Sequence, residues 1–520
     1  MKIKSKVALI ILDGWGVGPP WGGNAIIQAE TPTMDYYWRR CPHTTLLAAS
    51  EAVGLPPDSS GNSETGHLNI GAGRVVLQDL PFINTQIKNG SFFKNQNILR
   101  AFEHVKRNNS NLHLMGLISN GCVHADVSHL FSLVKMAKDN EITRVCLDLF
   151  TDGRDSDQNS ALGIFDKVNY KLKEIGAGRI TSICGRYFAM DRDKNWGRTS
   201  RAYQALTKGE AETSKSTRDA ISKAYLRNIS DEYIEPNIII DENDNKTIIN
   251  DNDSLILFNY RPDRSRQISK AFSPELLPEL ADRKILKNIC FVTFVTREQN
   301  PVGIVAFNPK EIKNSLAETI SNLGLKQFHI AETEKYAHVT YFINGGKEKP
   351  YPGEDNLMIP SPKVRTYDLA PQMSASKISE KLIVAASHNY DLLVCNYANA
   401  DMVGHVGNYY AAVQAVEYVD QFLGKVINNL FKYNYTLVVT ADHGNAEEML
   451  NPKTNKPQTE HTKNPVPFII ISKQIEIARS RLLTGGALAN VAPTILEIMG
   501  IEKPKEMTAE SLIAKVNARI

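Results

Sequence analysis

The stretch Val7-Ala-Leu-Ile-Ile-Leu-Asp13 is a short, almost wholly apolar run that ends at a carboxylate. The same pattern returns at Asp391-Leu-Leu-Val-Cys-Asn-Tyr397 and at Tyr435-Thr-Leu-Val-Val-Thr440, which Ala441-Asp442-His443 follows. Such continuous hydrophobicity is typical of strands buried on both faces of a parallel sheet. Because ligands bind beyond the carboxyl ends of these strands, we expect Asp13 and the Asp442-His443 pair at one functional edge.

Helical and extended patterns alternate outward from these runs. The segment Ala411 to Phe431 places its apolar residues at helical spacing. Further strands are predicted at Leu112 to Ser119, Arg144 to Phe150, Arg179 to Gly185 and Ser254 to Asn259. The polar segment Asp241 to Asp253 is predicted to form turns and an exposed hairpin. Alternating strands and helices predict an α/β fold.

The length of 520 residues indicates more than one core, because single cores rarely exceed roughly 300 residues. The polar groups at Asp13 and Ser63 need the Asp-His motifs near the C-terminus to complete their chemistry. We therefore predict a discontinuous domain, residues 1–76 with 312–520, and a second α/β domain inserted at residues 77–311.

The composition is that of a soluble globular protein, with 42% hydrophobic and 22% charged residues and a net charge of +3. This charge is too small to indicate nucleic-acid binding.

The apolar run that ends at Asp13 is too short for a signal-peptide core, and no stretch is long enough to span a membrane. Six dispersed cysteines predict buried free thiols in a reducing compartment. We expect a cytoplasmic protein without a membrane partner.

Carboxylates and imidazoles recur at ligand-like spacings near the C-terminus. Asp401 and His405 stand four residues apart, Asp442 and His443 follow a predicted strand, and His461 precedes an apolar run. Taken singly, these residues could be a helix cap, a turn residue or a surface imidazole. Together with Asp13, they supply enough oxygen and nitrogen ligands for two divalent ions. A mixed Asp/His set without thiolates suits manganese, zinc or cobalt rather than calcium.

Ser63 lies in the motif Gly61-Asn-Ser-Glu-Thr-Gly-His67. A serine at this place could simply cap the helix that contains Leu68. The alternative is a nucleophile, because a base or a metal ion can activate the hydroxyl and a helix N-terminus favours an anion.

Arginines stand beside carboxylates in the middle of the chain, in Thr151-Asp-Gly-Arg-Asp155, Gly185-Arg186 with Asp191-Arg192, and Arg261-Pro-Asp-Arg264. They could form surface salt bridges. They could equally form a forked clamp for carboxylate and phosphate, to which guanidinium geometry is suited. Lys335, in Ala331-Glu-Thr-Glu-Lys-Tyr336, is ambiguous as a lone lysine.

These motifs together resemble cofactor-independent phosphoglycerate mutase, in the family's order, from about residue 5 to about residue 515. The Asp-His motifs alone would indicate only the wider alkaline-phosphatase-like superfamily, whereas the serine and arginine motifs narrow the resemblance to the mutase. It implies a three-layer, alkaline-phosphatase-like domain that holds two metal ions, normally Mn²⁺ in bacterial members, and an inserted α/β transferase domain that holds glycerate.

The resemblance also implies a role for each matching residue. One metal would be bound by Asp401, His405 and His461, and the other by Asp13, Ser63, Asp442 and His443. The phosphoglycerate would be held by His124, Arg154, Asp155, Arg186, Arg192, Arg261, Arg264 and Lys335. Ser63 would carry the phosphoryl group between the 3- and 2-hydroxyls of a single glycerate, with Asp155 as a proton shuttle. The implied protein is a monomeric glycolytic isomerase whose partner is its small-molecule substrate.

The chain departs from the family's pattern in two places. The usual Gly-Gly-Val-His-Ser-His is here Gly121-Cys-Val-His-Ala-Asp126, and the usual Thr-Pro is Ser156-Asp157. Neither change touches a proposed metal ligand. Two other hypotheses remain open: another phosphoryl-transfer enzyme of the superfamily, such as a phosphopentomutase or phosphomonoesterase, and a binding protein that has lost turnover.

Overall fold

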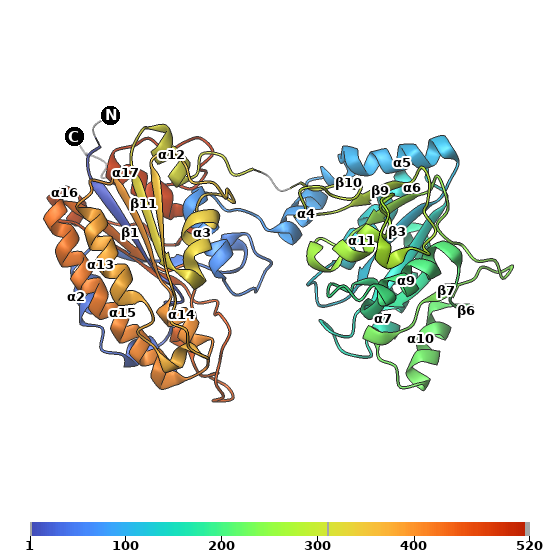
Figure 1. Ribbon diagram of the computed structural model, residues 1–520, viewed down its shortest axis with the longest axis horizontal. Coiled ribbons are helices and arrows are strands. Elements are labelled where there is room, and N and C mark those ends of the chain that lie inside the picture. The colour runs from blue at the N-terminus through green and yellow to red at the C-terminus, as the bar shows by residue number, and fades with distance from the viewer. Residues whose placement is uncertain (1–2, 309–310, 515–520) are drawn as a thin grey trace. The chain divides into compact units, whose positions relative to one another are not determined.

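The computed structural model describes residues 3–308 and 311–514. The chain divides into two compact units, each with its own sheet and core (Figure 1). Unit 1 is Met1–Gln78 with Glu311–Ile520, and unit 2 is Asp79–Lys310. The predicted α/β fold is confirmed, since both units consist of helices packed on mixed sheets dominated by parallel pairs.

The sheet of unit 1 has eight strands in the order β12-β11-β13-β1-β14-β15-β2-β16. The strands are β12 (Glu354–Ile359), β11 (Gln327–Glu332), β13 (Leu392–Tyr397), β1 (Lys6–Leu12), β14 (Tyr435–Thr440), β15 (Val466–Ile471), β2 (His43–Leu47) and β16 (Gly486–Ala487). The strands from β12 to β14 are parallel, whereas β15 pairs antiparallel with both β14 and β2.

Helices cover both faces of this sheet, as the left part of Figure 1 shows. Its helices are α1 (Ala25–Gln28), α2 (Pro32–Arg40), α3 (Ser63–Ala72), α12 (Leu316–Asn322), α13 (Ala375–Ala386), α14 (Asn399–Gly404), α15 (Tyr409–Leu430), α16 (Ile475–Ala478) and α17 (Val491–Met499). Single turns of 3-10 helix are η1 (Ser50–Val53), η6 (Thr333–Lys335), η8 (Tyr367–Leu369), η9 (Phe431–Tyr433), η10 (Ala446–Glu448) and η11 (Leu488–Asn490), and η7 (His338–Phe342) is a π-helix. Helices α2, α13 and α15 pack together, and α3, α12 and α17 form a second group.

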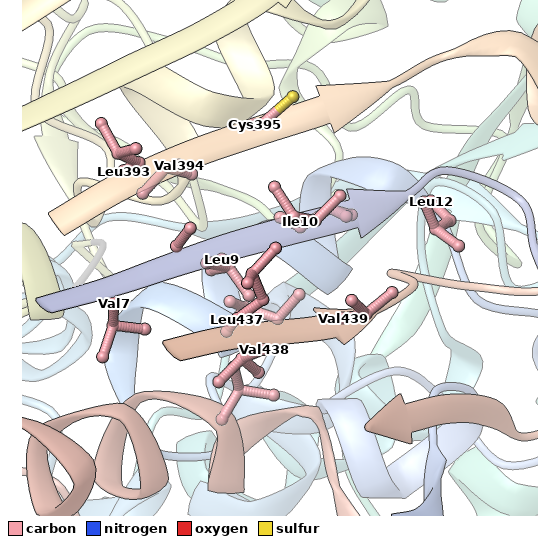
Figure 2. Packing of buried hydrophobic residues seen from close by; sticks show 14 of the residues in the cluster. Val7, Leu9, Ile10, Leu12, Leu393, Val394, Cys395, Leu437, Val438 and Val439 are labelled. Atoms are coloured by element: carbon pink, nitrogen blue, oxygen red, sulfur yellow. The ribbon is translucent and has the colours of Figure 1, made fainter. Parts of the chain in front are cut away.

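Strand β1 is the centre of the core of unit 1. Figure 2 shows its Val7, Leu9, Ile10 and Leu12 between apolar side chains of β13 and β14, and these four residues are at most 1% exposed. Each such buried side chain contributes about 1.5–3 kcal/mol relative to an exposed one. The register aligns the ends of the three strands, because Leu12 pairs with Tyr397 and Ile11 with Thr440. The polar residues that follow these strands therefore emerge at one edge.

The sheet of unit 2 also has eight strands, in the order β10-β9-β8-β3-β4-β5-β7-β6. The strands are β10 (Ile304–Val305), β9 (Cys290–Thr293), β8 (Ser254–Leu257), β3 (Leu112–Ile118), β4 (Val145–Thr151), β5 (Arg179–Gly185), β7 (Asn237–Ile239) and β6 (Glu212–Ser214). Only β5 and β7 pair antiparallel among these described strands. The helices are α4 (Asp79–Lys88), α5 (Gln96–Asn108), α6 (Val127–Asp139), α7 (Ala161–Ile175), α8 (Arg186–Ala189), α9 (Trp196–Lys208), α10 (Thr217–Leu226) and α11 (Arg266–Ala271), with 3-10 turns η2 (Phe92–Lys94), η3 (Asp231–Tyr233), η4 (Pro262–Arg264) and η5 (Pro278–Leu280).

The hairpin expected at Asp241 to Asp253 is wrong: this described segment contains turns and no strand. The Asp241 carboxylate accepts the backbone N–H groups of Asn243 and Asn245, at 2.9 and 2.8 Å. Such local side-chain bonds replace the cross-strand ladder that a hairpin needs.

The expectation that the cysteines are buried holds for Cys146, Cys184 and Cys395, whereas Cys41 and Cys290 are half-buried. All six thiols are free, but Cys122 is exposed in a loop with a left-handed φ of +49°.

No helix in the described part of the chain is long and apolar enough to cross a membrane.

Candidate functional site

The carboxyl edge of the unit 1 sheet gathers the polar residues that follow its central strands. Asp13 follows β1, Asp401 lies on α14 just after β13, and Asp442 and His443 follow β14. All four residues are at most 1% exposed. Because buried carboxylates need a cation or several donors, this edge is a site for positive charge.

Ser63 is the first residue of α3, and it does not cap that helix. Asn62 is the N-cap, and its side chain accepts the N–H of Thr65 at 2.9 Å. The Ser63 hydroxyl is free for other contacts: Oγ lies 2.9 Å from His443 Nε2 and 3.4 Å from Asp13 Oδ1. The helix N-terminus adds a field that favours an anion beside this oxygen.

Lys335 is placed differently from the other residues assigned to phosphoglycerate binding, because it belongs to unit 1. Its Nζ lies 2.7 Å from Asp13 Oδ1 and 2.6 Å from Asp401 Oδ2. It also donates to Ser63 Oγ at 2.6 Å. Burial alone would lower the pKa of Lys335, but these two carboxylates outweigh burial and raise it well above its ordinary value. Lys335 is therefore a fixed positive charge at the hydroxyl.

The imidazoles form a second layer around Asp401. His405 Nε2 lies 3.3 Å and His461 Nε2 lies 3.1 Å from Asp401 Oδ1. The His443 ring stacks on the ring of His461, with centroids 3.8 Å apart. Each Nδ1 faces a backbone carbonyl, of Thr459 for His405, Gly61 for His461 and Gly444 for His443. These contacts orient the three rings so that each Nε2 atom faces the cluster, as in metal sites.

The charges of this cluster shift its pKa values strongly. Burial would raise the pKa of Asp401, but Lys335 and the neighbouring imidazoles hold it well below its ordinary value. Burial would lower the pKa of His443, but the surrounding carboxylates, led by Asp442, raise it to about 9. Asp401 is thus ionised at neutral pH, which metal ligation requires.

The donor set fits divalent metal ions. The ligand atoms of Asp401, His443 and His461 lie within 4.8 Å of one another, and so do those of Asp13, His67 and Asp442. The buried Asp442 Oδ2 accepts no well-aligned hydrogen bond among the described residues, and its nearest charged neighbours are His67 Nδ1 at 3.3 Å and His443 Nε2 at 3.5 Å. Carboxylates and imidazoles without thiolates are typical ligands of Mn²⁺, Zn²⁺ and Co²⁺. His67, which ends the serine motif, joins this group only through the fold.

In unit 2, most of the predicted phosphoglycerate-binding residues form one connected group, the arginine cluster. It consists of His124, Arg154, Asp155, Arg186, Arg192, Arg261 and Arg264. The buried Arg186 donates to Asp155 and to Asp152, both at 2.5 Å. Asp152 in turn accepts the Ser119 hydroxyl. Asp152 and Ser119 are therefore positioning residues that the sequence analysis missed, although Asp152 stands in the quoted arginine motif.

Asp263 organises the other side of this cluster. Its carboxylate lies 2.9 Å from Arg192 Nη1 and 3.2 Å from Arg261 Nε. His124 lies between Asp155 and Asp263, at 3.6 and 3.5 Å. Burial, followed by the charge of Arg186, lowers the pKa of His124 to about 4, so the ring is neutral at pH 7.

Arg264 and Arg154 complete the positive charge. Burial and the charges of neighbouring arginines, first Arg186 and then Arg192 and Arg154, lower the pKa of Arg264. These guanidinium groups therefore lie close enough to repel one another, which a bound anion would relieve, and Arg154 also pairs with Glu232 at 3.5 Å. Asp126, which replaces a usual histidine of the family, accepts the N–H of Ser128 at 2.8 Å as the N-cap of α6. The negative charge of Asp126 therefore stabilises the N-terminus of α6.

The fold and the buried Asp/His cluster define the class first. The chain matches the model of the Metalloenzyme superfamily from residue 5 to residue 503, so it is a member of that superfamily. Curated relatives named 2,3-bisphosphoglycerate-independent phosphoglycerate mutase include those of Chloroflexus aurantiacus and Thermomicrobium roseum, each 47% identical over 98% of this chain and 98% of the relative. The crystal structure of Leishmania mexicana phosphoglycerate mutase at low cobalt concentration matches with a TM-score of 0.63 and 31% identity, covering 98% of both chains. The chain belongs to the family of 2,3-bisphosphoglycerate-independent phosphoglycerate mutases.

Proposed function

We propose that this protein interconverts 3-phosphoglycerate and 2-phosphoglycerate through a phosphoserine at Ser63, without 2,3-bisphosphoglycerate. The observation that carries the proposal is the Ser63 hydroxyl at a helix N-terminus, 2.6 Å from the ammonium of Lys335 and 2.9 Å from His443. A buried serine that faces a fixed cation and an imidazole is suited to attack a phosphoryl group.

The proposed metal centre comprises two groups of ligands. Asp401, His405 and His461 hold one divalent ion, and Asp13, Ser63, Asp442 and His443 hold the other, with Mn²⁺ as the proposed metal. When bound, such ions lower the pKa of the serine hydroxyl and neutralise the charge of the phosphate. The ionised carboxylates and the inward-facing Nε2 atoms support this assignment.

The proposed reaction has two mirrored steps. In the first step, Ser63 Oγ forms a bond to phosphorus as the bond from phosphorus to the 3-oxygen of glycerate breaks, and the proton that Ser63 loses ends on the freed 3-oxygen with Asp155 as its carrier. In the second step, the 2-oxygen forms a bond to phosphorus as the bond from phosphorus to Ser63 Oγ breaks, and the 2-hydroxyl proton returns through Asp155 to Ser63. Lys335 neutralises the transferred phosphoryl group in both steps.

The arginine cluster is the proposed binding site for the glycerate. Its guanidinium groups match carboxylate and phosphate oxygens in pairs. Asp152 and Asp263 keep those groups oriented. The neutral His124 offers a ring nitrogen as a hydrogen-bond partner for a glycerate hydroxyl.

The first experiment removes bound metal with a chelator, restores Mn²⁺ and supplies 3-phosphoglycerate without bisphosphoglycerate, with enolase as the coupling enzyme. Turnover that needs the metal but not the bisphosphate is the expected result. Release of inorganic phosphate without 2-phosphoglycerate would replace the mutase proposal with a phosphatase. If neither 2-phosphoglycerate nor inorganic phosphate forms, a binding protein without turnover is favoured.

We further propose a cytoplasmic monomer in glycolysis and gluconeogenesis that has no nucleic-acid or membrane partner. The small net charge of +3 supports the absence of a nucleic-acid partner. Light scattering coupled to size-exclusion chromatography should give the mass of one 57.9 kDa chain, and a doubled mass would contradict the monomer.

A further inference from the structure

Glu447 is a carboxylate with 0% exposure in η10 that the proposed reaction does not use. Its Oε2 accepts the backbone N–H groups of Gly16 and Asn445, at 3.1 and 2.8 Å. Its Oε1 accepts the hydroxyl of Thr462 and the side-chain amide of Asn464, the latter at 3.0 Å. Four neutral donors therefore converge on one buried carboxylate, which compensates the cost of its burial.

The donors belong to three separate loops, and each loop carries a proposed metal ligand. Gly16 comes three residues after Asp13, Asn445 two residues after His443, and Thr462 directly after His461. The loop of Gly16 is far from the other two in the sequence, since Gly16 and Glu447 are separated by 431 positions, whereas Thr462 follows Glu447 by 15. The single carboxylate is a common anchor for all three.

Thr462 extends the anchor to the serine loop. Its N–H donates to the carbonyl of Gly444 at 3.0 Å, and its carbonyl accepts the N–H of Gly61 at 3.3 Å. Gly61 stands two residues before Ser63. A shift of Thr462 would therefore move the approach to the nucleophile as well as His461.

Three glycines leave the space that this carboxyl group fills. A Cβ atom on Gly16 would lie 2.2 Å from Glu447 Cδ, and one on Gly444 would lie 2.3 Å from Oε1. A Cβ atom on Gly18 would lie 2.9 Å from Cγ. Because all three distances are shorter than real Cβ contacts, a side chain on these loops could not coexist with Glu447 in its place.

We infer that Glu447 is a positioning residue that holds these three loops so that the side chains of Asp13, His443 and His461 keep their mutual spacing. The inference rests on the proposed metal centre. Removal of the carboxylate leaves four inward-facing donors without their acceptor, so the loops must separate or admit water. Mutation of a group that orients metal ligands without binding the metal typically lowers metal affinity by roughly 10- to 100-fold.

The test measures Mn²⁺ binding to the chelator-treated full chain by titration calorimetry. Glu447→Ala should weaken Mn²⁺ binding roughly 10- to 100-fold. The matched control is Asp420→Ala in α15 of the same unit, a carboxylate with 1% exposure that accepts the N–H groups of Thr33 and Met34 at 2.9 and 2.7 Å. Both variants should lower the melting temperature without metal, but Asp420→Ala should bind Mn²⁺ as the wild type does.

Wild-type affinity in Glu447→Ala, or an equal loss of affinity in both variants, would overturn the inference. If the wild type itself binds no Mn²⁺, the proposed metal centre fails, and this inference fails with it. If Glu447→Ala yields no folded protein, Glu447→Asp decides. Its carboxylate is one methylene shorter and cannot reach the donors of all three loops, so weaker Mn²⁺ binding supports the inference and unchanged binding overturns it.

Discussion

Ser63 could act as a helix cap or as a nucleophile, and the contacts of its hydroxyl distinguish these two roles. The cap is supplied by Asn62, so the Ser63 hydroxyl points to Lys335 and His443 rather than to the helix backbone. A serine used only as a cap would have its oxygen on the N–H groups of the first turn. The hydroxyl that α3 does not use is available for chemistry.

Replacement of this oxygen tests its role directly. We expect Ser63→Ala to lower mutase turnover by roughly 10³-fold or more, because the transferred group loses its acceptor. Mn²⁺ binding should stay mostly intact, because the other proposed ligands remain. Enolase-coupled turnover and calorimetry on the same preparation give both values. Substantial turnover in the alanine variant would rule out a phosphoserine at this position.

The imidazoles of the metal centre predict how Mn²⁺ affinity depends on pH. The pKa of His443, raised to about 9, means that a proton occupies its Nε2 below that pH. A metal ion needs the neutral ring, so binding must release the proton. The apparent affinity should therefore rise about tenfold per pH unit between about pH 6.5 and 8.5 from this group alone.

Calorimetry in buffers of different ionisation enthalpy would count the released protons. The exposed His43 on β2 supplies a control, since His43→Gln should leave the slope unchanged. An affinity that does not vary over this window would contradict ligation by His443.

At the scale of elements, α3 owes its position to small residues rather than to an apolar stripe. A Cβ atom on Gly66 would lie 2.5 Å from the carbonyl oxygen of Asp442. The helix can therefore approach the loop after β14 only because this residue has no side chain. This close approach brings Ser63 within hydrogen-bonding distance of His443.

We accordingly expect Gly66→Ala to push α3 away and to lower turnover by roughly tenfold or more, since an ångström of misplacement can cost about 100-fold. Gly163→Ala on α7 is the control, because a Cβ atom there would meet no atom within 4 Å and alanine favours helices by about 0.5–1 kcal/mol. Steady-state kinetics and thermal melts distinguish the two. Wild-type activity in Gly66→Ala would refute the packing argument.

The sheet of unit 2 contains a buried histidine that lies between two carboxylates. His113 on β3 lies 2.8 Å from Asp148 on β4 and 3.5 Å from Asp253. Burial alone would lower the pKa of His113, but the two carboxylates outweigh burial and raise it to about 9. The imidazolium thus ties neighbouring strands together while it remains protonated.

The sign of the resulting pH dependence follows from the raised pKa. The unfolded histidine titrates near 6.5, so the stabilisation is complete below about pH 6.5 and is lost as pH rises through about 9. The wild type should lose about 3 kcal/mol of unfolding free energy over that window relative to His113→Gln. Urea denaturation of both proteins at several pH values checks this, and parallel curves would contradict it.

At the scale of the whole molecule, the two units divide the proposed work. The nucleophile and the metal ligands belong to unit 1, whereas the arginine cluster belongs to unit 2. Unit 2 is one continuous stretch with its own sheet and a separate apolar core. A stretch of this size with its own core can fold by itself.

A fragment of residues 79–310 should therefore fold, melt cooperatively and bind 3-phosphoglycerate, but should show no turnover because it lacks Ser63. Circular dichroism and calorimetry test the two properties. Arg186→Ala in the same fragment is the matched control and should weaken binding at least tenfold, by about 1.4 kcal/mol or more. A fragment that unfolds would show that unit 2 depends on unit 1, and equal binding by the two fragments would remove Arg186 from the proposed site.

The amino-acid sequence alone determined the α/β class, the positions of the central strands and the residues at their ends. These follow from local patterns: a short, β-branched apolar run such as Val7 to Leu12 favours a strand buried on both faces, and the polar groups after it emerge at the edge of the sheet. The tertiary structure decided what depends on partners distant in the chain. It placed Lys335 beside Ser63 and brought three loops into hydrogen-bonding distance of the Glu447 carboxylate. It also showed local side-chain bonds instead of the expected hairpin at Asp241 to Asp253. No local sequence pattern predicts the contacts of Lys335 and Glu447, because they join residues up to several hundred positions apart. Such contacts form only when the sheet aligns its strands.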